Sequence, residues 1–505
     1  MLAMKFLVQR SCSVVSRLVN KVSNKILCAL FLAFIFVLPG VTYSEENSID
    51  LMSDDFDLLE DSSLEDLEAE LDFNKEWEVE VLDKNEVIEE EKFGRFGIEG
   101  FSGSINQSFA FGIEDPGASF DRQKSGLERI RTAFNINYKG EISPSVKYKL
   151  GGMLRYDWGK SDNDQYRMGG NSVYLKLKDA YLDIYPSENI WLRIGNQIIA
   201  RGQFDGLSIT DTINPRDLSI PAQGELSEFR QHVPAALISI PIQNAKLELI
   251  LTYDAGANNV GQPGSGFDPL VLFQNHPLLG ASSLSAKYIK PSNRTELFAR
   301  LSYAFNGGDL AVVFSDENLN QRNLKSVITS SFLSELHFGF DRVQKFGFSG
   351  NLARGNYLFK YEGAQIAGVP IPGKDPTILP WKKKDQSVMG FGLDYSGINN
   401  LTISFENDIK LVQEYSEDLS GSKTSVGQAF QARWTGLNDL LSISGSVSKL
   451  NGEKSVISSL AANYNVRDGL SLGARVVHYQ ASSVSDSFYP YQNQDVIMLS
   501  TEYSF

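Results

Sequence analysis

Hydrophobic and polar residues alternate with a period of two along much of the chain after Phe93. In residues 129–139, isoleucine, threonine, phenylalanine and tyrosine alternate with arginine, asparagine and lysine, and residues 146–156 repeat the pattern. The alternation continues to the last residue, because Ile497, Leu499, Tyr503 and Phe505 fall on one face of a strand. Such a period is typical of β-strands that have an apolar environment on one side and water on the other. Residues 93–505 are therefore predicted to be all-β.

The connections between these predicted strands are of two kinds. Short polar turns, such as 185–189, 306–309 and 466–469, alternate with long segments near 112–126, 157–171, 200–234, 254–293, 316–334, 366–385, 414–424 and 482–493. Short turns at one end and long loops at the other are typical of a transmembrane antiparallel β-barrel. Counting the segments predicts 18 strands, with 16 as the second choice. The count of 18 requires one short connection, 450–454, at the long-loop end. A soluble β-sandwich would not need this asymmetry.

Two neighbouring predicted strands place basic residues on one face. Lipid does not accept this face, because Arg or Lys at the bilayer midplane costs about 2–4 kcal/mol. We therefore expect a basic wall inside the barrel, formed by Arg129, Arg131, Lys139, Lys147, Lys149 and Arg155, with Arg193 extending it. Left unpaired, this wall would attract anions into the lumen. The alternative is that carboxylates from the loops neutralise it.

The segment 200–234 is the best candidate for a constriction of the lumen. A loop of this length is uncommon unless it is functional. Its apolar residues Ile209, Ile213, Leu218 and Ile220 need cover, and the dipeptide Asn214-Pro215 is a turn signal. We expect the segment to fold into the barrel and to pair its carboxylates with the basic wall, and the alternative is a mobile external loop. The candidate residues are Arg201, Asp205, Asp211, Asn214, Arg216, Asp217, Glu225 and Arg230.

The N-terminus has the features of a secretory signal peptide. Residues 1–44 contain five basic residues and no acidic residue, and a 13-residue apolar run, 26–38, precedes Pro39-Gly40 and a small-residue site. The run is too short to span a bilayer comfortably. Both cysteines, Cys12 and Cys28, lie within this region. We therefore expect cleavage near Ser44 and a mature chain without thiols.

The net charge of −15 is concentrated in one short segment. Residues 45–92 hold 21 Asp and Glu against three lysines, whereas residues 93–505 are close to neutral. We expect 45–92 to form an acidic periplasmic arm, mostly disordered or with one short helix. Two interpretations remain open: a solvated spacer, or a docking peptide for a basic groove on a periplasmic partner. The apolar anchors that favour docking are Phe56, Leu58, Leu59, Leu64, Leu67, Leu71 and Trp77.

Two features of the chain resemble known outer-membrane proteins. A last strand that ends in Tyr503 and Phe505 is similar to that of bacterial outer-membrane barrels, which implies recognition by the barrel-insertion machinery. Residues 180–218, with Asn214-Pro215-Arg216-Asp217, resemble a family of large proteobacterial outer-membrane proteins of undefined function. That family accompanies transporters of the resistance-nodulation-division class, which implies movement of an amphiphilic or hydrophobic compound. Gly195-Asn196-Gln197 lacks the arginine of the family pattern, and barrels of the alginate-export type are the second resemblance.

Several function classes find no support in the residues. The chain has only four histidines, in no arrangement that suggests catalysis, and we found no ligand spacing for a metal and no patch for nucleic acid. We therefore expect no enzyme activity, no cofactor and no metal. Three functions remain: an outer-membrane conduit for a solute, coupled to a periplasmic or inner-membrane transporter through residues 45–92; an anion-preferring porin; or a membrane anchor whose arm recruits periplasmic machinery. In each, the partners include outer-membrane lipid.

Overall fold

The computed structural model describes residues 100–113, 126–158, 172–187, 189–224, 229–261, 266–274, 276, 279, 283–329, 333–378, 380–449, 455–481, 489–492 and 494–505. The predicted signal peptide, residues 1–44, and the predicted acidic arm, residues 45–92, lie outside these ranges. No helix within the described ranges is long and apolar enough to cross a membrane.

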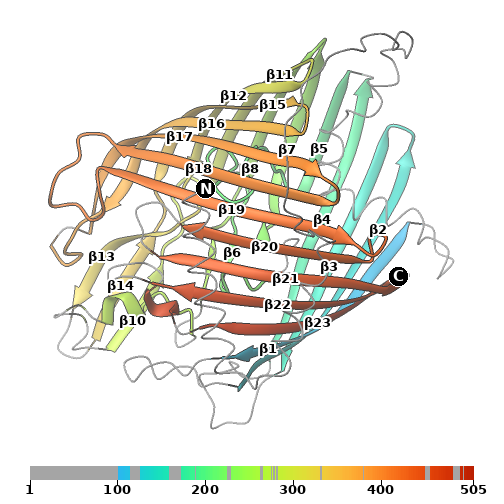
Figure 1. The fold of residues 1–505 in the computed structure, drawn as a ribbon. Coiled ribbons are helices and arrows are strands. Elements are labelled where there is room, and N and C mark those ends of the chain that lie inside the picture. The colour runs from blue at the N-terminus through green and yellow to red at the C-terminus, as the bar shows by residue number, and fades with distance from the viewer. Residues whose placement is uncertain are drawn as a thin grey trace, which may run out of the picture. The chain divides into compact units, whose positions relative to one another are not determined.

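Eighteen antiparallel strands form a closed β-barrel (Figure 1). Each strand pairs with the next one of the barrel along the chain, and the last strand pairs with the first, Ser104 opposite Ser504. The predicted fold class and the strand number of 18 are therefore confirmed, and the second choice of 16 is wrong. The strands are β1 (Phe101–Gly112), β2 (Gly126–Ser143), β3 (Val146–Trp158), β4 (Ser172–Ser187), β5 (Ile190–Gln197), β7 (Val233–Ile242), β8 (Ala245–Tyr253), β11 (Thr295–Phe305), β12 (Gly308–Asn318), β15 (Arg342–Arg354), β16 (Tyr357–Pro372), β17 (Trp381–Ile398), β18 (Leu401–Val412), β19 (Thr424–Gly436), β20 (Leu441–Lys449), β21 (Val456–Arg467), β22 (Leu470–Gln480) and β23 (Val496–Ser504).

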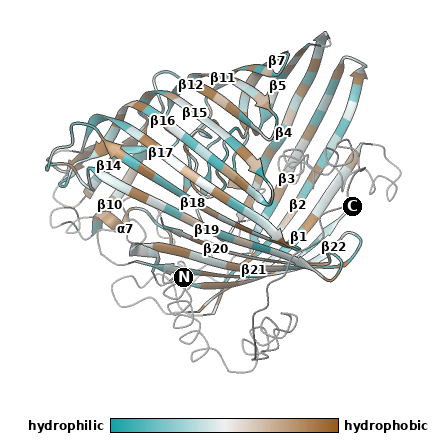
Figure 2. Ribbon diagram, turned by 45° about the horizontal axis from the view of Figure 1, so that its top comes forward, coloured by the Kyte–Doolittle hydropathy of each residue, from teal (hydrophilic) through white to brown (hydrophobic). Residues whose placement is uncertain are grey.

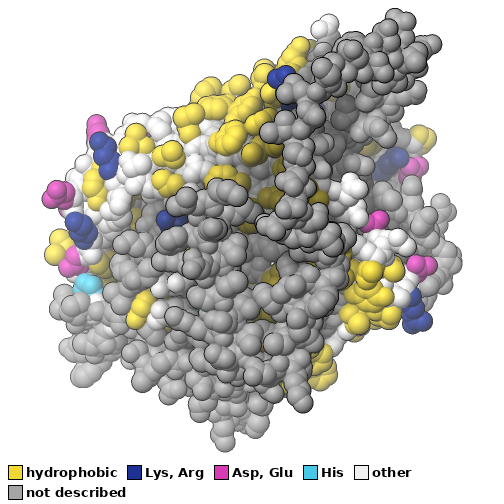
Figure 3. Space-filling view, viewed as in Figure 1, with side chains coloured by type: hydrophobic (Ala, Val, Ile, Leu, Met, Phe, Trp, Pro, Cys, Tyr) yellow, Lys and Arg dark blue, Asp and Glu magenta, His cyan; other side chains and the backbone are white. Residues whose placement is uncertain are grey.

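The outer surface of the barrel is apolar, as the alternation along the strands predicts. Brown and teal residues alternate along the ribbons in Figure 2. Large side chains such as Phe346, Leu460 and Phe391 point outward and are 59%, 52% and 47% exposed. In Figure 3, hydrophobic side chains cover the outside of β11 and β12, whereas the visible charged side chains lie mostly toward the ends of the strands. A closed barrel with such a surface pairs its backbone groups between strands and can face lipid.

The two ends of the barrel differ, as the loop lengths predict. At one end, near Gly100 and Phe505, hairpin turns of two to four residues join the strands. Gly307, Gly355 and Gly469 in these turns have φ angles of 82°, 58° and 78°, which glycine adopts without steric cost. At the other end, two connections differ from the prediction. β16 and β17 run through most of the predicted loop 366–385, and the predicted loop 316–334 contains the end of β12, all of β13 and the start of β14.

Short elements within the long connections form a small cap. Its three-stranded sheet contains β10 (Ser283–Tyr288), β13 (Asn323–Thr329) and β14 (Leu333–Gly339). Leu270, Leu279, Leu324 and Leu336 are buried beside this sheet and form its core. The remaining short elements are β6 (Asp217–Leu218), β9 (Asn259–Val260), α7 (Val271–Gln274) and η1 (Tyr489–Tyr491).

Candidate functional site

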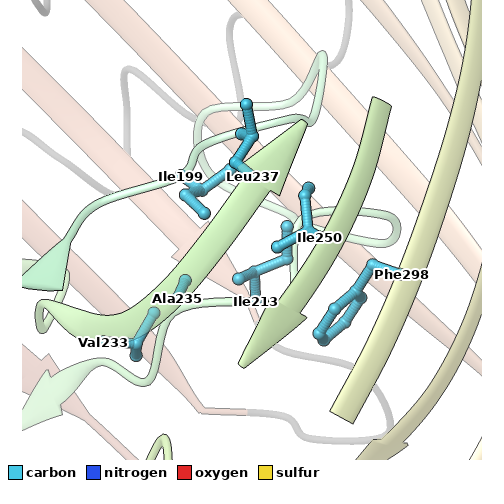
Figure 4. Packing of buried hydrophobic residues seen from close by; sticks show 7 residues of the cluster. All are labelled: Ile199, Ile213, Val233, Ala235, Leu237, Ile250 and Phe298. Atoms are coloured by element: carbon cyan, nitrogen blue, oxygen red, sulfur yellow. The ribbon is translucent and has the colours of Figure 1, made fainter. Parts of the chain in front are cut away.

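We call the connection between β5 and β7 the lumen loop, and its described residues, 198–224 and 229–232, lie inside the barrel. Ile199 and Ile213 of the loop pack against Leu237, Ile250 and Phe298, which face inward from β7, β8 and β11 (Figure 4). These five side chains are at most 4% exposed. These apolar residues of the loop are thus buried against the inner face of the barrel rather than at its rim.

A single carboxylate on β16 binds four backbone N–H groups of the lumen loop. Glu362 is fully buried. Its Oε1 accepts hydrogen bonds from the backbone N–H groups of Gln203 and Phe204, the latter at 3.2 Å. Its Oε2 accepts from Ile209 at 3.0 Å and Thr210 at 2.8 Å. Hydrogen bonds from N–H groups to a buried carboxylate are charge-assisted, so this residue is a strong anchor for the loop.

A second carboxylate, on β18, binds the residues between these two pairs. Glu406 accepts from the backbone N–H groups of Asp205, Gly206 and Leu207 at 2.7–2.9 Å. Lys360 Nζ lies 3.2 Å from Glu406 Oε1 and 3.3 Å from Asp205 Oδ2, and it also pairs with Asp394. The segment 203–210 thus donates seven backbone N–H groups to two buried glutamates. We call Glu362 and Glu406 the anchor glutamates.

The same segment packs its apolar side chains against the barrel wall. Phe204, Leu207 and Ile209 are buried against Ala364 and Val388, which lie on the inner faces of β16 and β17. Gly390 of β17 leaves space for the Phe204 ring, because a Cβ at this position would lie 2.4 Å from the ring. Hydrogen bonds and close packing therefore hold this part of the loop together, and both depend on residues far away in the sequence.

Beyond Asn214, the loop reaches β22, across the barrel from β7 and β8. The Tyr479 hydroxyl donates a hydrogen bond to the Pro221 carbonyl and accepts one from Gln223 Nε2 at 3.2 Å. Arg475 donates to the carbonyl of Gly224 at 2.8 Å. Tyr479 and Arg475 both lie on β22. The described part of the lumen loop thus touches walls on both sides of the lumen.

The Asn-Pro motif joins the two ends of the lumen loop. Asn214 Oδ1 accepts from the N–H of Ile199 at 2.7 Å, and its Nδ2 donates to the carbonyl of Gln231 at 2.7 Å. Arg216 lies over the ring of Phe229, at 5.3 Å from the centroid. Burial lowers the pKa of the Arg216 guanidinium. Asn214 therefore ties together the backbone at the start and the end of the lumen loop. The sequence motif indicated only a turn at this position.

The ion pairs of the loop differ from those expected. Asp205 pairs with Lys360, Asp211 pairs with Arg230 at 2.6 Å, and Arg201 pairs with Glu248 of β8 at 3.0 Å. Each of these carboxylates thus has a partner outside the predicted basic wall. Asp217 accepts from Ser219 and Asn259, and Glu225 lies outside the described residues.

The residues of the predicted basic wall lie on β2, β3 and β5, and carboxylates of β2, β3 and β4 accompany most of them. Arg131 pairs with Asp157 of β3 at 2.6 Å. The remaining pairs are Arg155 with Asp157 at 3.5 Å, Lys149 with Asp179 at 3.1 Å, Arg193 with Asp183 at 2.7 Å, and Lys147 with Glu141 at 2.9 Å. The sequence-based alternatives were an unpaired wall or one neutralised by loops. In the structure the neutralising groups come from β2, β3 and β4 instead.

The other two basic residues differ from this group. Arg129 is the member of the wall that reaches the lumen loop, and it donates to Gln223 Oε1 at 3.1 Å. Lys139 lies at the short-turn end of β2, where its backbone N–H donates to the carbonyl of Gly100. The seven basic residues therefore do not form one continuous unpaired surface.

The aromatic C-terminus lies at the seam of the barrel. The Phe505 N–H and carbonyl pair with the backbone of Gly103 at 2.9 and 2.8 Å. The ring of Phe505 lies 6.2 Å from that of Tyr503 and 6.1 Å from that of Phe101, measured between centroids. These contacts show a role in closure, and recognition by insertion machinery stays a prediction.

The predicted docking residues of the arm, from Phe56 to Trp77, lie outside the described residues. Within the described ranges, no group of three or more His, Cys, Asp and Glu side chains is placed to hold a metal ion.

Sequence reasoning missed both anchor glutamates and Lys360. A signal for them existed, because Lys360 and Glu362 are two positions apart on one face of a predicted strand. Glu406, Asp408 and Lys410 repeat this spacing on β18. The argument that placed the basic wall inside the barrel applies equally to these charges.

No family model and no curated protein matches the chain. Several solved structures resemble it in part. OccAB3 of Acinetobacter baumannii is 13% identical, with a TM-score of 0.47 over 80% of this chain and 98% of that chain. OccK9 (OpdG) and OccK11 (OpdR) of Pseudomonas aeruginosa are 11% and 12% identical, with TM-scores of 0.46 and 0.45. Each covers 80% of this chain, and 97% and 95% of its own length. At this level of likeness, they assign no family to the chain.

Proposed function

We propose that the protein is a channel in the outer membrane of a Gram-negative bacterium and that the lumen loop constricts it. The observation that carries the proposal is the pair of anchor glutamates, which hold residues 203–210 inside a closed barrel with an apolar outer surface. A barrel that served only as an anchor would gain nothing from a loop fixed across its lumen. Inward-facing polar residues, such as Asn135 and Ser446, favour a hydrophilic solute.

Planar-bilayer conductance tests this proposal. We expect the intact mature protein to conduct ions, and a form that lacks residues 204–230 to conduct several-fold more because the constriction has been removed. Absence of conductance in both forms would exclude an aqueous channel and favour the anchor function. Strong anion selectivity of the intact form would favour an anion-preferring porin and would mean that the paired basic wall still sets the field in the lumen.

The resemblance to transporter-associated barrels extends the proposal to a partner. In this extension, residues 45–92 dock a periplasmic carrier or an inner-membrane transporter, and the cargo is amphiphilic. Deletion of 45–92 separates the two parts: conductance of the purified barrel should stay unchanged, whereas export or uptake in cells should fail. Normal transport in cells with the shortened protein would contradict the docking function of the arm.

A further inference from the structure

Two groups of polar side chains interrupt the apolar outer surface of the barrel. On β18 and β19, Asn407 and Gln428 lie opposite each other in register, and we call this pair the first amide site. They point outward, because their chain neighbours Glu406 and Ala429 face the lumen loop. Lys449 lies opposite Gln428 at the loop end of β20, where its long side chain can carry the ammonium group to the polar headgroups.

The second amide site is on the strands that close the barrel. It consists of Gln107 of β1 with Thr132 of β2 and Thr501 of β23, which lie opposite it in register. The Gln107 Oε1 accepts a hydrogen bond from the Thr132 hydroxyl at 2.6 Å. Ile105 and Phe109, two positions before and after Gln107, are exposed on the outer surface. Side chains two positions apart on a strand share a face, so Gln107 also points outward.

Both amide sites lie within the apolar band of the barrel rather than at its edges. Asn407 stands between the exposed side chains of Phe405 and Ile409, as Gln107 stands between its own apolar neighbours. Asn407 and Gln107 are each the seventh residue of a strand that begins at the short-turn end of the barrel. The two sites therefore lie at about the same depth in the membrane, where lipid offers no partner for a hydrogen bond.

The amide groups have more hydrogen-bonding capacity than their own chain uses. Within the part of the chain that the structure describes, no acceptor faces the NH2 group of Gln107, and the Gln428 side chain makes no hydrogen bond. Asn407 uses one N–H, which donates to the Gly427 carbonyl at 3.4 Å. Amides without partners are costly in hydrocarbon. These groups therefore indicate contact with another protein surface at the same depth.

A second copy of this chain fits both sites. Copies that insert in the same direction hold their amide sites at the same depth, so the first site of one copy can meet the second site of the next. Each side-chain amide both donates and accepts, so the two sites are complementary. Between them, Ala462 of β21 and Ala474 of β22 lie opposite each other on the outer surface and leave room for close approach. On the far side of the barrel, hydrophobic side chains cover β11 and β12, which suits lipid (Figure 3).

We propose that the outer face from β18 to β2 joins copies of this chain into a closed ring, in which the first amide site of each copy pairs with the second amide site of its neighbour. Contact between two different sites is head-to-tail, and it forms a ring when the rotation closes. The sites lie five strands apart on a convex surface, from β19 to β1, so one neighbour cannot cover both. The ring therefore holds at least three copies. This inference rests on the proposed place of the barrel in the outer membrane and goes beyond the channel function.

Pairwise cross-linking tests which sites meet. Because both native cysteines lie in the predicted signal peptide, Gln107→Cys and Gln428→Cys should supply the only thiols of the mature chain. Oxidation in outer-membrane vesicles should link the double variant into products of three or more chains, whereas either single variant alone should give none. The matched control is Ala299→Cys combined with Gln428→Cys. Ala299 is the seventh residue from the short-turn end of β11, on the far side of the barrel, so this pair should give no product.

The mass of the purified protein tests whether the amides are needed. Leucine suits a lipid-facing position, so the double variant Gln107→Leu and Gln428→Leu should still form the barrel. In mild detergent, we expect light scattering to give at least three copies for the intact mature protein and one copy for the leucine variant. A monomeric or dimeric intact protein, an unchanged mass of the leucine variant, or absence of the cross-link between positions 107 and 428 would overturn the inference. Conductance of a monomer would then leave the channel function intact, whereas a ring without conductance would refute the channel and support the interface.

Discussion

Replacement of Glu362 by glutamine should release the lumen loop. The carboxylate accepts two backbone N–H groups on each oxygen. Glutamine keeps one acceptor oxygen and turns its NH2 group toward the other two donors. Two charge-assisted hydrogen bonds are then lost, at about 1.5–3 kcal/mol each. Because the side chain is fully buried, solvent screening does not reduce this value.

The resulting loss of about 3–6 kcal/mol is large for a single loop. A difference of about 3 kcal/mol changes an equilibrium constant about 100-fold. A loop whose detached state is rare in the intact protein should therefore detach often in the variant. We expect larger and noisier single-channel currents, and a lumen loop that reagents can reach.

Thiol labelling measures this release directly. Since both cysteines lie in the predicted signal peptide, Ser208→Cys should give the mature chain a single thiol inside the lumen loop. Glu362→Gln should raise its labelling rate at least about tenfold, a cautious bound for a loss of this size. Glu414→Gln is the control, because Glu414 is a 90% exposed glutamate whose partner Lys384 lies 3.6 Å away. Equal labelling and equal conductance in Glu362→Gln and the parent would refute the anchoring role.

Two further predictions concern glycines of the barrel wall. Gly390→Ala places a methyl group 2.4 Å from the Phe204 ring and should cost about 1–3 kcal/mol of packing free energy. We expect the conductance to rise in this variant and the additional change Phe204→Ala to reverse the rise. An unchanged conductance in Gly390→Ala would mean that the loop does not pack against this wall. Gly103→Val should lower the temperature at which the barrel loses its compact form in gel electrophoresis, because Cβ at this position meets the Phe505 ring at 2.8 Å. Gly445→Ala, with no heavy atom nearer than 3.8 Å, is the control for both, and equal behaviour of Gly103→Val and Gly445→Ala would argue against a tight seam.

The fold could be predicted because its signals are local. Alternation along one strand identifies its two faces, and turn residues mark the ends of hairpins. The prediction missed the extended hairpin of β16 and β17, whose segment contains Pro370 and Pro372, and proline is uncommon inside strands. In the structure both prolines lie in β16, opposite Lys383 and Trp381, at the far end of the strand, where a missing N–H group is tolerated.

The candidate site could be predicted only in part. The length of the segment 200–234 and its apolar residues indicated a loop that needs cover. Its partners could not be predicted, because each anchor glutamate binds backbone N–H groups, which every non-proline residue offers equally. The basic wall was visible from the spacing of its residues, yet its pairing with Asp157, Asp179 and Asp183 depends on the register between strands.

The distance along the chain between the lumen loop and its anchors has a consequence for assembly. Glu362 follows its loop partners by 152–159 positions, and Glu406 follows its partners by 199–201. Segment 203–210 has no carboxylate to bind until β16 and β18 are in place. Contacts of such long separation form late, since chain closure must precede them. An intermediate arrested before β18 would therefore keep a hydrated loop and a wide lumen, and seating of the loop would mark a completed barrel.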